Sequence, residues 1–351
     1  MKTIKFCVFL SLFLGGTTAF AVGDVAITGE LDVALSLKHL PTRDQGKTAF
    51  SIPRLNLDIE APIRENNQIF LQLESSEYRD GTSQRFDTQL KKAYLSLVSI
   101  FPEGTELRYG LIPDYYTELQ KEQWDYDFWG ASSLLPLIKY KYVSWSDLGL
   151  MYQSELPGDW GQWALTVTNG EGYQSDEIGP RKEAQLLIGL KKLAPFYATL
   201  AYTYGAYDAY DPSFNKKTRL VLNLSYEFSK GLMALEFYNA EDPANAVMTG
   251  GMAAGVDVSA YGGTSIQGQG ASLFGQAELS EKADLFLRAD YLSPVTKDKE
   301  KKLTAISTGF SYDTNEDLRW ALAYEYTDYS DTYAGAIRDE SQLILATRVT
   351  F

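Results

Sequence analysis

The sequence predicts an all-β protein: a transmembrane antiparallel β-barrel of about sixteen strands, with an inward-folded loop 3. Three observations predict this class. Short segments of alternating apolar and polar residues recur along almost the whole chain, as expected for strands whose two faces meet different surroundings. A secretion-type segment precedes them, and the chain ends in an alternating segment closed by the aromatic residue Phe351. Together these features favour a secreted chain that folds in a membrane over a soluble β-sandwich.

Residues 1–21 have the composition of a removable secretory signal. Two lysines lie near the start, residues 6–14 form a short apolar run, and Ala19-Phe20-Ala21 places small residues at cleavage spacing. The apolar run is shorter than the ~20 residues that a membrane-spanning helix needs. We therefore expect a signal peptide cleaved after Ala21, followed by one barrel domain at residues 22–351.

Sixteen segments show the two-residue periodicity of strands. In residues 220–228, for example, Asn223, Ser225 and Glu227 alternate with apolar residues, so one face suits lipid and the other suits water. Short turns follow every second segment and longer polar loops follow the others, which is typical of periplasmic turns and extracellular loops. The predicted strands are 27–37, 54–61, 69–74, 94–97, 107–111, 148–153, 163–168, 184–190, 197–204, 220–228, 233–237, 271–279, 285–291, 306–312, 320–326 and 343–351.

Charge and rare residues argue against several function classes. The formal net charge of −14 argues against a nucleic-acid partner, because no basic stripe could neutralise phosphates. Cys7 lies within the signal and His39 is the one histidine, so we expect no metal site, no cofactor and no enzyme activity. The predicted surroundings are outer-membrane lipid and lipopolysaccharide. An acidic surface suits that leaflet only where divalent cations bridge the two, and it would bias a pore toward cations.

The connection at about residues 113–146, loop 3, is one of the two longest and mixes aromatic with charged residues. A sixteen-stranded barrel would be a wide, unselective hole without a loop to narrow it. We expect the loop aromatics to pack on the wall and the loop acids to face strand arginines across a constriction, where rings of charge select solutes. The predicted constriction residues are Arg54, Asp58, Arg108, Glu118, Lys121, Glu122, Asp125, Asp127, Arg288 and Arg348.

Other arrangements of these residues remain open at this point. Loop 3 could be an exterior loop whose aromatics touch neighbouring loops. The arginines and acids could pair along the wall and structure the lumen without selecting solutes. The Gly-rich segment 250–270 of the sixth loop is the next candidate for the constriction.

Four short motifs resemble the phosphate-selective porin family. They are Leu90-Lys91-Lys92-Ala93-Tyr94-Leu95, Tyr109-Gly110-Leu111-Ile112-Pro113 with Glu118, Ser146-Asp147-Leu148-Gly149-Leu150 and Thr168-Asn169-Gly170-Glu171-Gly172. The resemblance is best over residues 50–175, and beyond them it rests on strand rhythm. It implies a homotrimeric sixteen-stranded channel. The four acids of loop 3 depart from the dense Lys/Arg lining on which that family's phosphate path depends.

The sequence therefore indicates an outer-membrane porin that passes small hydrophilic solutes or ions by diffusion. Two alternatives accompany this hypothesis. One is a channel specific for a sugar, a carboxylate or phosphate, in which the loop aromatics guide the solute. The other is a plugged structural or adhesive barrel whose long loops bind a surface partner.

Overall fold

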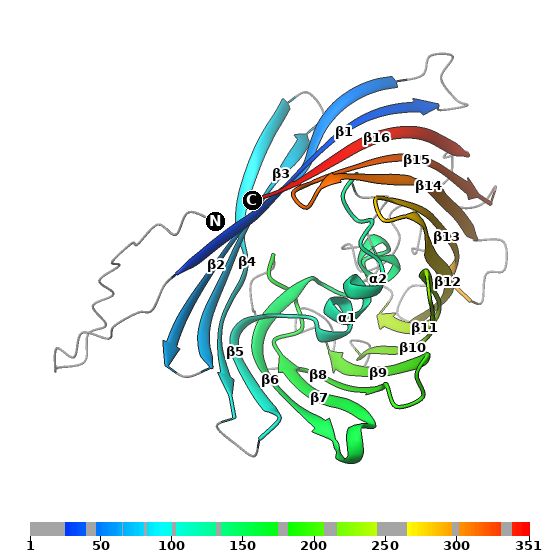
Figure 1. Cartoon of the computed structure of the whole chain (residues 1–351). Coiled ribbons are helices and arrows are strands. Elements are labelled where there is room, and N and C mark those ends of the chain that lie inside the picture. Colours follow the sequence, from blue (N-terminus) through cyan, green and yellow to red (C-terminus); the bar gives the residue numbers. More distant parts are fainter. Residues whose placement is uncertain are drawn as a thin grey trace.

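The computed structural model contains a closed barrel of sixteen antiparallel strands, in which each strand pairs with its sequence neighbours and the last pairs with the first (Figure 1). The predicted fold class is confirmed. The structure describes residues 25–39, 47–64, 66–80, 83–99, 103–130, 135–174, 182–206, 216–243, 265–296, 302–330 and 339–351.

The strands lie where the alternating segments predicted them, and most extend further. Their bounds are β1 Ala26–His39, β2 Lys47–Arg64, β3 Asn67–Asp80, β4 Ser83–Val98, β5 Thr105–Pro113, β6 Ser146–Leu156, β7 Gly161–Thr168, β8 Glu183–Leu190, β9 Phe196–Ala206, β10 Lys216–Phe228, β11 Gly231–Pro243, β12 Ser265–Ser280, β13 Ala283–Ser293, β14 Leu303–Asn315, β15 Leu318–Tyr329 and β16 Glu340–Thr350. Two helices, α1 Tyr115–Gln123 and α2 Pro136–Lys139, interrupt the series between β5 and β6.

Strand β4 shows the largest departure from the predicted bounds, because it begins eleven residues before the predicted start at residue 94. A β-bulge between Gln72 and Leu73 of the partner strand adds one residue to β4, so that Lys92 faces Gln72 while Leu90 faces Leu73. The bulge shifts the alternation by one residue. A strict two-residue pattern therefore fails to extend through Lys91 and Lys92, and the prediction was too short for this physical reason.

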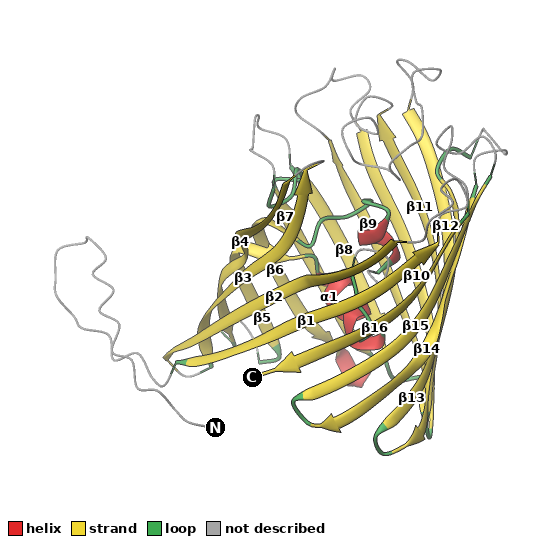
Figure 2. Ribbon diagram, turned by 90° about the horizontal axis from the view of Figure 1, so that it is seen from above, coloured by secondary structure: helices red, strands yellow, loops and turns green. Residues whose placement is uncertain are grey.

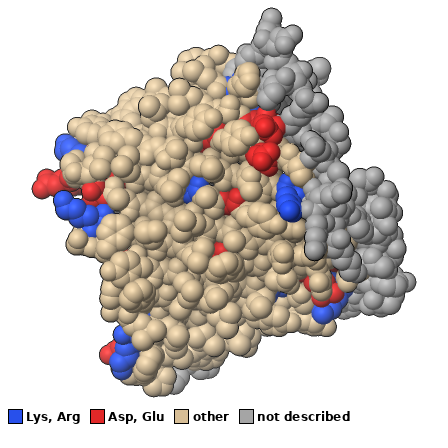
Figure 3. Space-filling view, turned by 90° about the vertical axis from the view of Figure 1, so that its right-hand side faces the viewer, with Lys and Arg blue, Asp and Glu red and all other residues tan. Residues whose placement is uncertain are grey.

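The outer face of the barrel is apolar, as lipid exposure requires. Along β10, Leu220 and Leu224 are 46% and 43% exposed, whereas the intervening Asn223 is 2% exposed. Figure 3 shows one side of the molecule, where residues other than Lys, Arg, Asp and Glu cover most of the face. Within the described ranges, no helix is long and apolar enough to cross a membrane.

The two ends of the chain close the barrel together. Strands β1 and β16 pair from Glu30–Thr350 to His39–Ser341. Beyond the last pair, Phe351 and Gly29 exchange both backbone hydrogen bonds, at 2.8 and 3.0 Å. A side chain at Gly29 would meet the Phe351 ring at 2.6 Å, so glycine lets the terminal aromatic lie flat against β1. The last residue is therefore part of the seam.

Loop 3 lies inside the barrel. Figures 1 and 2 show α1 and α2 within the ring of strands. The residues of this loop make up much of the buried interior: Trp124, Tyr126, Phe128 and Trp129 are each at most 4% exposed. The predicted inward fold of loop 3 is confirmed, and the exterior arrangement is wrong.

Candidate functional site

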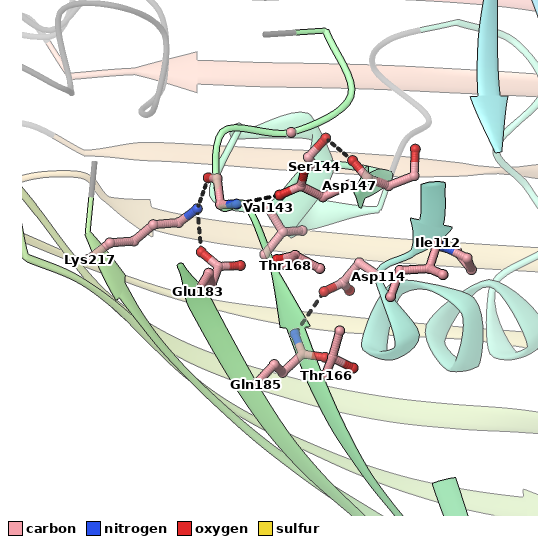
Figure 4. A pocket seen from close by; sticks show the side chains of 14 residues that line it. Ile112, Asp114, Val143, Ser144, Asp147, Thr166, Thr168, Glu183, Gln185 and Lys217 are labelled. Carbon is pink, nitrogen blue, oxygen red and sulfur yellow. Dashed lines mark hydrogen bonds and ion pairs between the residues drawn. The ribbon is translucent and has the colours of Figure 1, made fainter. Parts of the chain in front are cut away.

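Loop 3 leaves the wall at Asp114, directly after Pro113 ends β5. The Asp114 carboxylate caps α1, because Oδ1 accepts hydrogen bonds from Thr117 N at 2.8 Å and Thr117 Oγ1 at 2.7 Å. Its other oxygen, Oδ2, accepts a bond from Gln185 Nε2 on β8 at 2.7 Å (Figure 4). Burial raises the pKa of Asp114, although these hydrogen bonds oppose the rise. One side chain thus starts the helix and attaches it to the wall.

A small polar cavity of about 40 Å³ lies beside this attachment, between the start of loop 3 and strands β6, β7, β8 and β10 (Figure 4). Lys217 reaches it from β10 and forms an ion pair with Glu183 at 2.6 Å. Asp147 Oδ2 accepts a hydrogen bond from Gly170 N at 2.5 Å. The volume suits a few ordered waters, so the cavity belongs to the anchorage of the loop. Within the described ranges, no group of three or more His, Cys, Asp or Glu side chains is placed to hold a metal ion.

The far side of α1 docks on β11. Tyr116 Oη and Gln120 Nε2 both donate hydrogen bonds to Oε2 of Glu236, and all three residues are at most 2% exposed. A buried carboxylate needs such donors, because desolvation penalises its charge. The helix is therefore held against the wall opposite β1–β5.

An aromatic cluster then fixes the segment that follows α1. The ring centroids of Tyr126 and Phe286 lie 4.3 Å apart in a stacked arrangement. Trp129 stacks on the same Phe286 ring at 5.2 Å, and Trp124 meets it edge-on at 6.1 Å. Aromatic pairs of this geometry add about 0.5–1.5 kcal/mol each to the burial of their area. The expected packing of loop aromatics on the wall is what the structure contains.

A buried arginine–aspartate network joins the same segment to the barrel seam. Asp32 of β1 lies directly opposite Arg54 of β2 and Arg348 of β16 in the strand register. Both arginines bind Asp32, at 3.0 and 2.9 Å, and both reach loop 3 at Asp127, at 3.0 and 2.8 Å. The carboxylates of Asp32 and Asp127 are 0% exposed. Two fixed guanidinium forks thus clamp one loop carboxylate, a geometry that arginine provides and lysine does not.

The charges of this network shift the titration of Asp127. Burial alone would raise the pKa of the Asp127 carboxyl, but Arg54, Lys121 and Arg348 outweigh it and hold that pKa well below its usual range. Asp125 is less buried than Asp127: its side chain is 49% exposed, and it binds Arg319 at 2.7 Å and Arg348 at 3.2 Å.

A second charged group lies on the side of α1 that faces β1–β5. Glu118 binds Arg108 of β5 at 2.6 Å and Lys92 of β4 at 3.4 Å. Lys121 approaches Glu30 of β1 at 3.9 Å. These side chains are between 15% and 35% exposed, in contrast to the buried network at the seam. Glu118 and Lys121 are therefore loop 3 charges that remain partly exposed to the lumen.

The predicted constriction residues therefore divide into separate groups. Arg54, Arg348 and Asp127 meet at the seam, with Asp125 at its edge, and Arg108, Glu118 and Lys121 meet beside α1. Arg288 pairs within its own strand: it binds Asp290 at 2.7 Å, and it lies 5.8 Å from the Trp124 ring. Asp58 accepts a hydrogen bond from Gln72 at 2.7 Å, and Glu122 is exposed on α1. Loop 6, at 250–270, was the other candidate, and most of it lies outside the described residues.

Several members of the site were not among the predicted residues. Asp32 lies within the first predicted strand, but its partners lie 22 and 316 residues away, a separation that no local pattern reports. Lys91 and Lys92 both face the lumen because of the β4 bulge; Lys91 binds Glu74 and lies 4.2 Å from the Trp145 ring. Two adjacent lysines that interrupt the alternation after Leu90 were the available signal.

A larger cavity of about 610 Å³ opens between loop 3 and strands β1, β2 and β3. Serines 36, 51 and 76 line it together with Arg54, Glu74, Glu77 and Asp127, and Trp145 borders it. Its floor is the network at the seam, since Arg54 and Asp127 belong to both. Loop 3 thus fills the lumen toward β11–β15 and leaves space beside β1–β3.

No protein-family model matches this chain, and no curated protein matches its sequence. Solved structures are similar in fold. An anion-selective porin from Comamonas acidovorans has a TM-score of 0.65 at 14% identity, over 93% of this chain and 99% of the porin. The outer membrane channel DcaP of Acinetobacter baumannii has a TM-score of 0.61 at 12% identity, over 96% and 100%. OmpT of Vibrio cholerae, an outer membrane protein solved in a trimer form, has a TM-score of 0.59 at 13% identity, over 93% and 99%. The chain therefore has the fold of sixteen-stranded Gram-negative outer-membrane porins.

Proposed function

We propose that this protein is an outer-membrane porin through which small hydrophilic solutes or ions diffuse passively. The observation that carries the proposal is the one-sided docking of loop 3. The loop is fixed to β11 and to the seam, while a polar cavity of about 610 Å³ remains beside β1–β3. In a plugged barrel, the loop would cover the lumen wall on all sides. Here one side of the wall remains charged and partly exposed. Similarity to an outer membrane protein, a porin and an outer membrane channel at 12–15% identity supports the fold that this function requires.

The proposal includes the surroundings of the barrel. We infer cleavage after Ala21, insertion into the lipid and lipopolysaccharide of the outer membrane, and assembly as a homotrimer. The apolar outer face and the trimer form of one similar structure support these steps. A diffusion channel needs no cofactor and performs no catalysis.

A solute-specific channel is the second candidate. It is favoured by the cavity, whose serine hydroxyls, charged groups and bordering Trp145 resemble the mixed lining of small-molecule sites. Phosphate is the solute that the resemblance to phosphate-selective porins suggests. The anchored Arg54 and Lys91 argue against it, because each is already bound to a carboxylate. Conductance that saturates with one solute would mark a specific channel.

Conductance of the purified chain in planar bilayers tests the proposal. A passive porin gives stepwise currents that grow linearly with salt concentration. A plugged structural or adhesive barrel, correctly inserted as shown by a heat-modifiable band and β-type circular dichroism, stays silent. Silence of such inserted protein would contradict the channel function.

A further inference from the structure

The side of α1 that faces β1–β5 is called its free side. The wall opposite this side contains two neighbouring rows of lumen-facing residues. The strand register places Asp58, Gln72 and Lys92 in one row across β2, β3 and β4. The next row contains Glu60, Phe70 and Tyr94, and the rings of Phe70 and Tyr94 stack at 5.2 Å. Glu118 of α1 binds Lys92 of the first row, so these rows and α1 face one another.

Positive charge is matched on this side of loop 3. Lys92 and Arg108 bind Glu118, Arg108 also binds Glu106 at 2.7 Å, and Lys121 approaches Glu30. Every cation of this group therefore has a carboxylate within 4 Å. A solute that passes α1 meets these cations as neutral pairs.

Negative charge is not matched. In the described part of the chain, Asp58, Glu60 and Glu122 have no cation within 4 Å. Asp58 is half-buried and receives one hydrogen bond, from the neutral amide of Gln72, while Glu60 and Glu122 are exposed. Six carboxylates thus stand against three cations beside the free face of α1, an excess of three negative charges.

The buried acids of the network at the seam contribute little to this balance. Asp32 and Asp127 have fully buried side chains, each bound by two arginines. Asp127 lines the cavity beside β1–β3, but its charge and that of Asp32 are offset by the two arginines that bind them both. The charges that act most strongly on a passing ion are those that are unpaired and exposed to water.

We propose that Asp58, Glu60 and Glu122 make this channel prefer cations, as specificity-determining residues of the water path beside α1. This inference rests on the proposed channel function. It is a field effect of three unmatched carboxylates along the path and requires no bound ion. It names Glu60, a residue outside the predicted constriction, and removes Asp125 and Asp127 from the role expected for them.

The reversal potential of the inserted full-length mature chain under a tenfold potassium chloride gradient tests the inference. Wild-type protein should show a cation-preferring potential. The triple variant Asp58→Asn, Glu60→Gln, Glu122→Gln should lower the cation-to-anion permeability ratio by about threefold or more, because each charge acts over a few ångströms of water. The effect should shrink at ~1 M salt, where the Debye length is ~3 Å.

A matched triple variant removes the same number of charges elsewhere. Glu103, Glu281 and Glu316 are exposed acids at the turns after β4, β12 and β14, and their conversion to glutamine should leave the potential unchanged. An anion-preferring wild type, or equal effects of the two triples, overturns the inference while leaving the channel function intact. A silent bilayer contradicts the channel function and the inference together. Asp125→Asn should behave like the control, and a threefold shift there would also contradict the assignment.

Discussion

The two sides of loop 3 differ in how their charges are used. On the docked side, the carboxylate of Asp127 is 0% exposed and lies between two arginines, next to aromatic rings. On the free side, Glu118 and Lys121 are 25% and 35% exposed, and Glu122 is more exposed still. Residues of the same chemical type hold the loop in place on one side and remain exposed on the other. Burial and pairing decide which role a charge has.

This contrast separates the charges that fix the loop from those that the proposed channel would present to ions. Buried ion pairs are costly to form but also costly to break, because removal of one partner leaves the other charge buried and unpaired. Exposed pairs contribute about 0–1 kcal/mol and leave their field accessible to ions. Changes on the docked side should therefore alter the position of the loop, and changes on the free side should alter the ions that pass it.

The largest effect is expected when the aromatic anchor is removed. Trp124 is 1% exposed and packs on Tyr126, Phe274 and Phe286. Trp124→Ala should cost about 3–5 kcal/mol of docking free energy, raise single-channel conductance and make loop 3 sensitive to protease. Trp160→Ala, at a turn where the indole is 45% exposed, is the control and should change neither. A Trp124→Ala channel with wild-type conductance would show that the ring does not hold the loop.

A smaller effect is expected from the clamped carboxylate. Asp127→Asn removes the charge that Arg54 and Arg348 share, although Asp32 still binds both. We expect a loss of about 3 kcal/mol in loop docking, seen as current noise and faster proteolysis within loop 3. Asp125→Asn, two residues away and 49% exposed, should cost less than about 1 kcal/mol. Equal effects of the two amides would remove the distinction between buried and exposed acids on this loop.

The pH dependence follows from the same carboxylate. The pKa of Asp127 is held well below its usual range, so its contribution to docking is fully present above the unfolded value near ~3.9 and is lost only as pH falls through the lower folded value. Protease resistance of loop 3 should therefore stay constant from about pH 8 to about pH 4. In the Asp127→Asn variant, the protease resistance of loop 3 should be lower. It should also lack the part that wild-type protein loses as pH falls through the folded pKa of Asp127. A wild-type transition at about pH 5 would mean that another group controls docking.

Most of the fold could be predicted from the sequence because barrel strands alternate with a fixed period. The pattern along residues 220–228 placed β10 correctly and identified its two faces. It failed at β4, where the bulge at Lys91 and Lys92 breaks the period. The inward path of loop 3 could also be predicted, since Trp124, Tyr126 and Trp129 need a wall to pack on.

The pairing of the charged residues could be predicted only in part. Arg288 and Asp290 are two apart on one strand and share a face, so their ion pair was accessible to the same alternation argument. The meeting of Asp32 with Arg348 depends on the register between the first and last strands, which the sequence does not encode locally. Which acids of loop 3 are buried and which are exposed to water also depends on that register.

In the proposed channel, α1 has one docked side and one side in the water path, and thiol accessibility tests this arrangement most directly. The chain from Val22 onward contains no cysteine, so single cysteines can be placed at Thr117, which is 2% exposed, and at the exposed Glu122. In the inserted channel, Glu122→Cys should react with a neutral water-soluble maleimide about a hundredfold faster than Thr117→Cys, the ratio given by an opening free energy of about 3 kcal/mol. Modification at Glu122→Cys should also reduce the current. Equal rates at the two positions, or a current unaffected by the label at Glu122→Cys, would contradict the account.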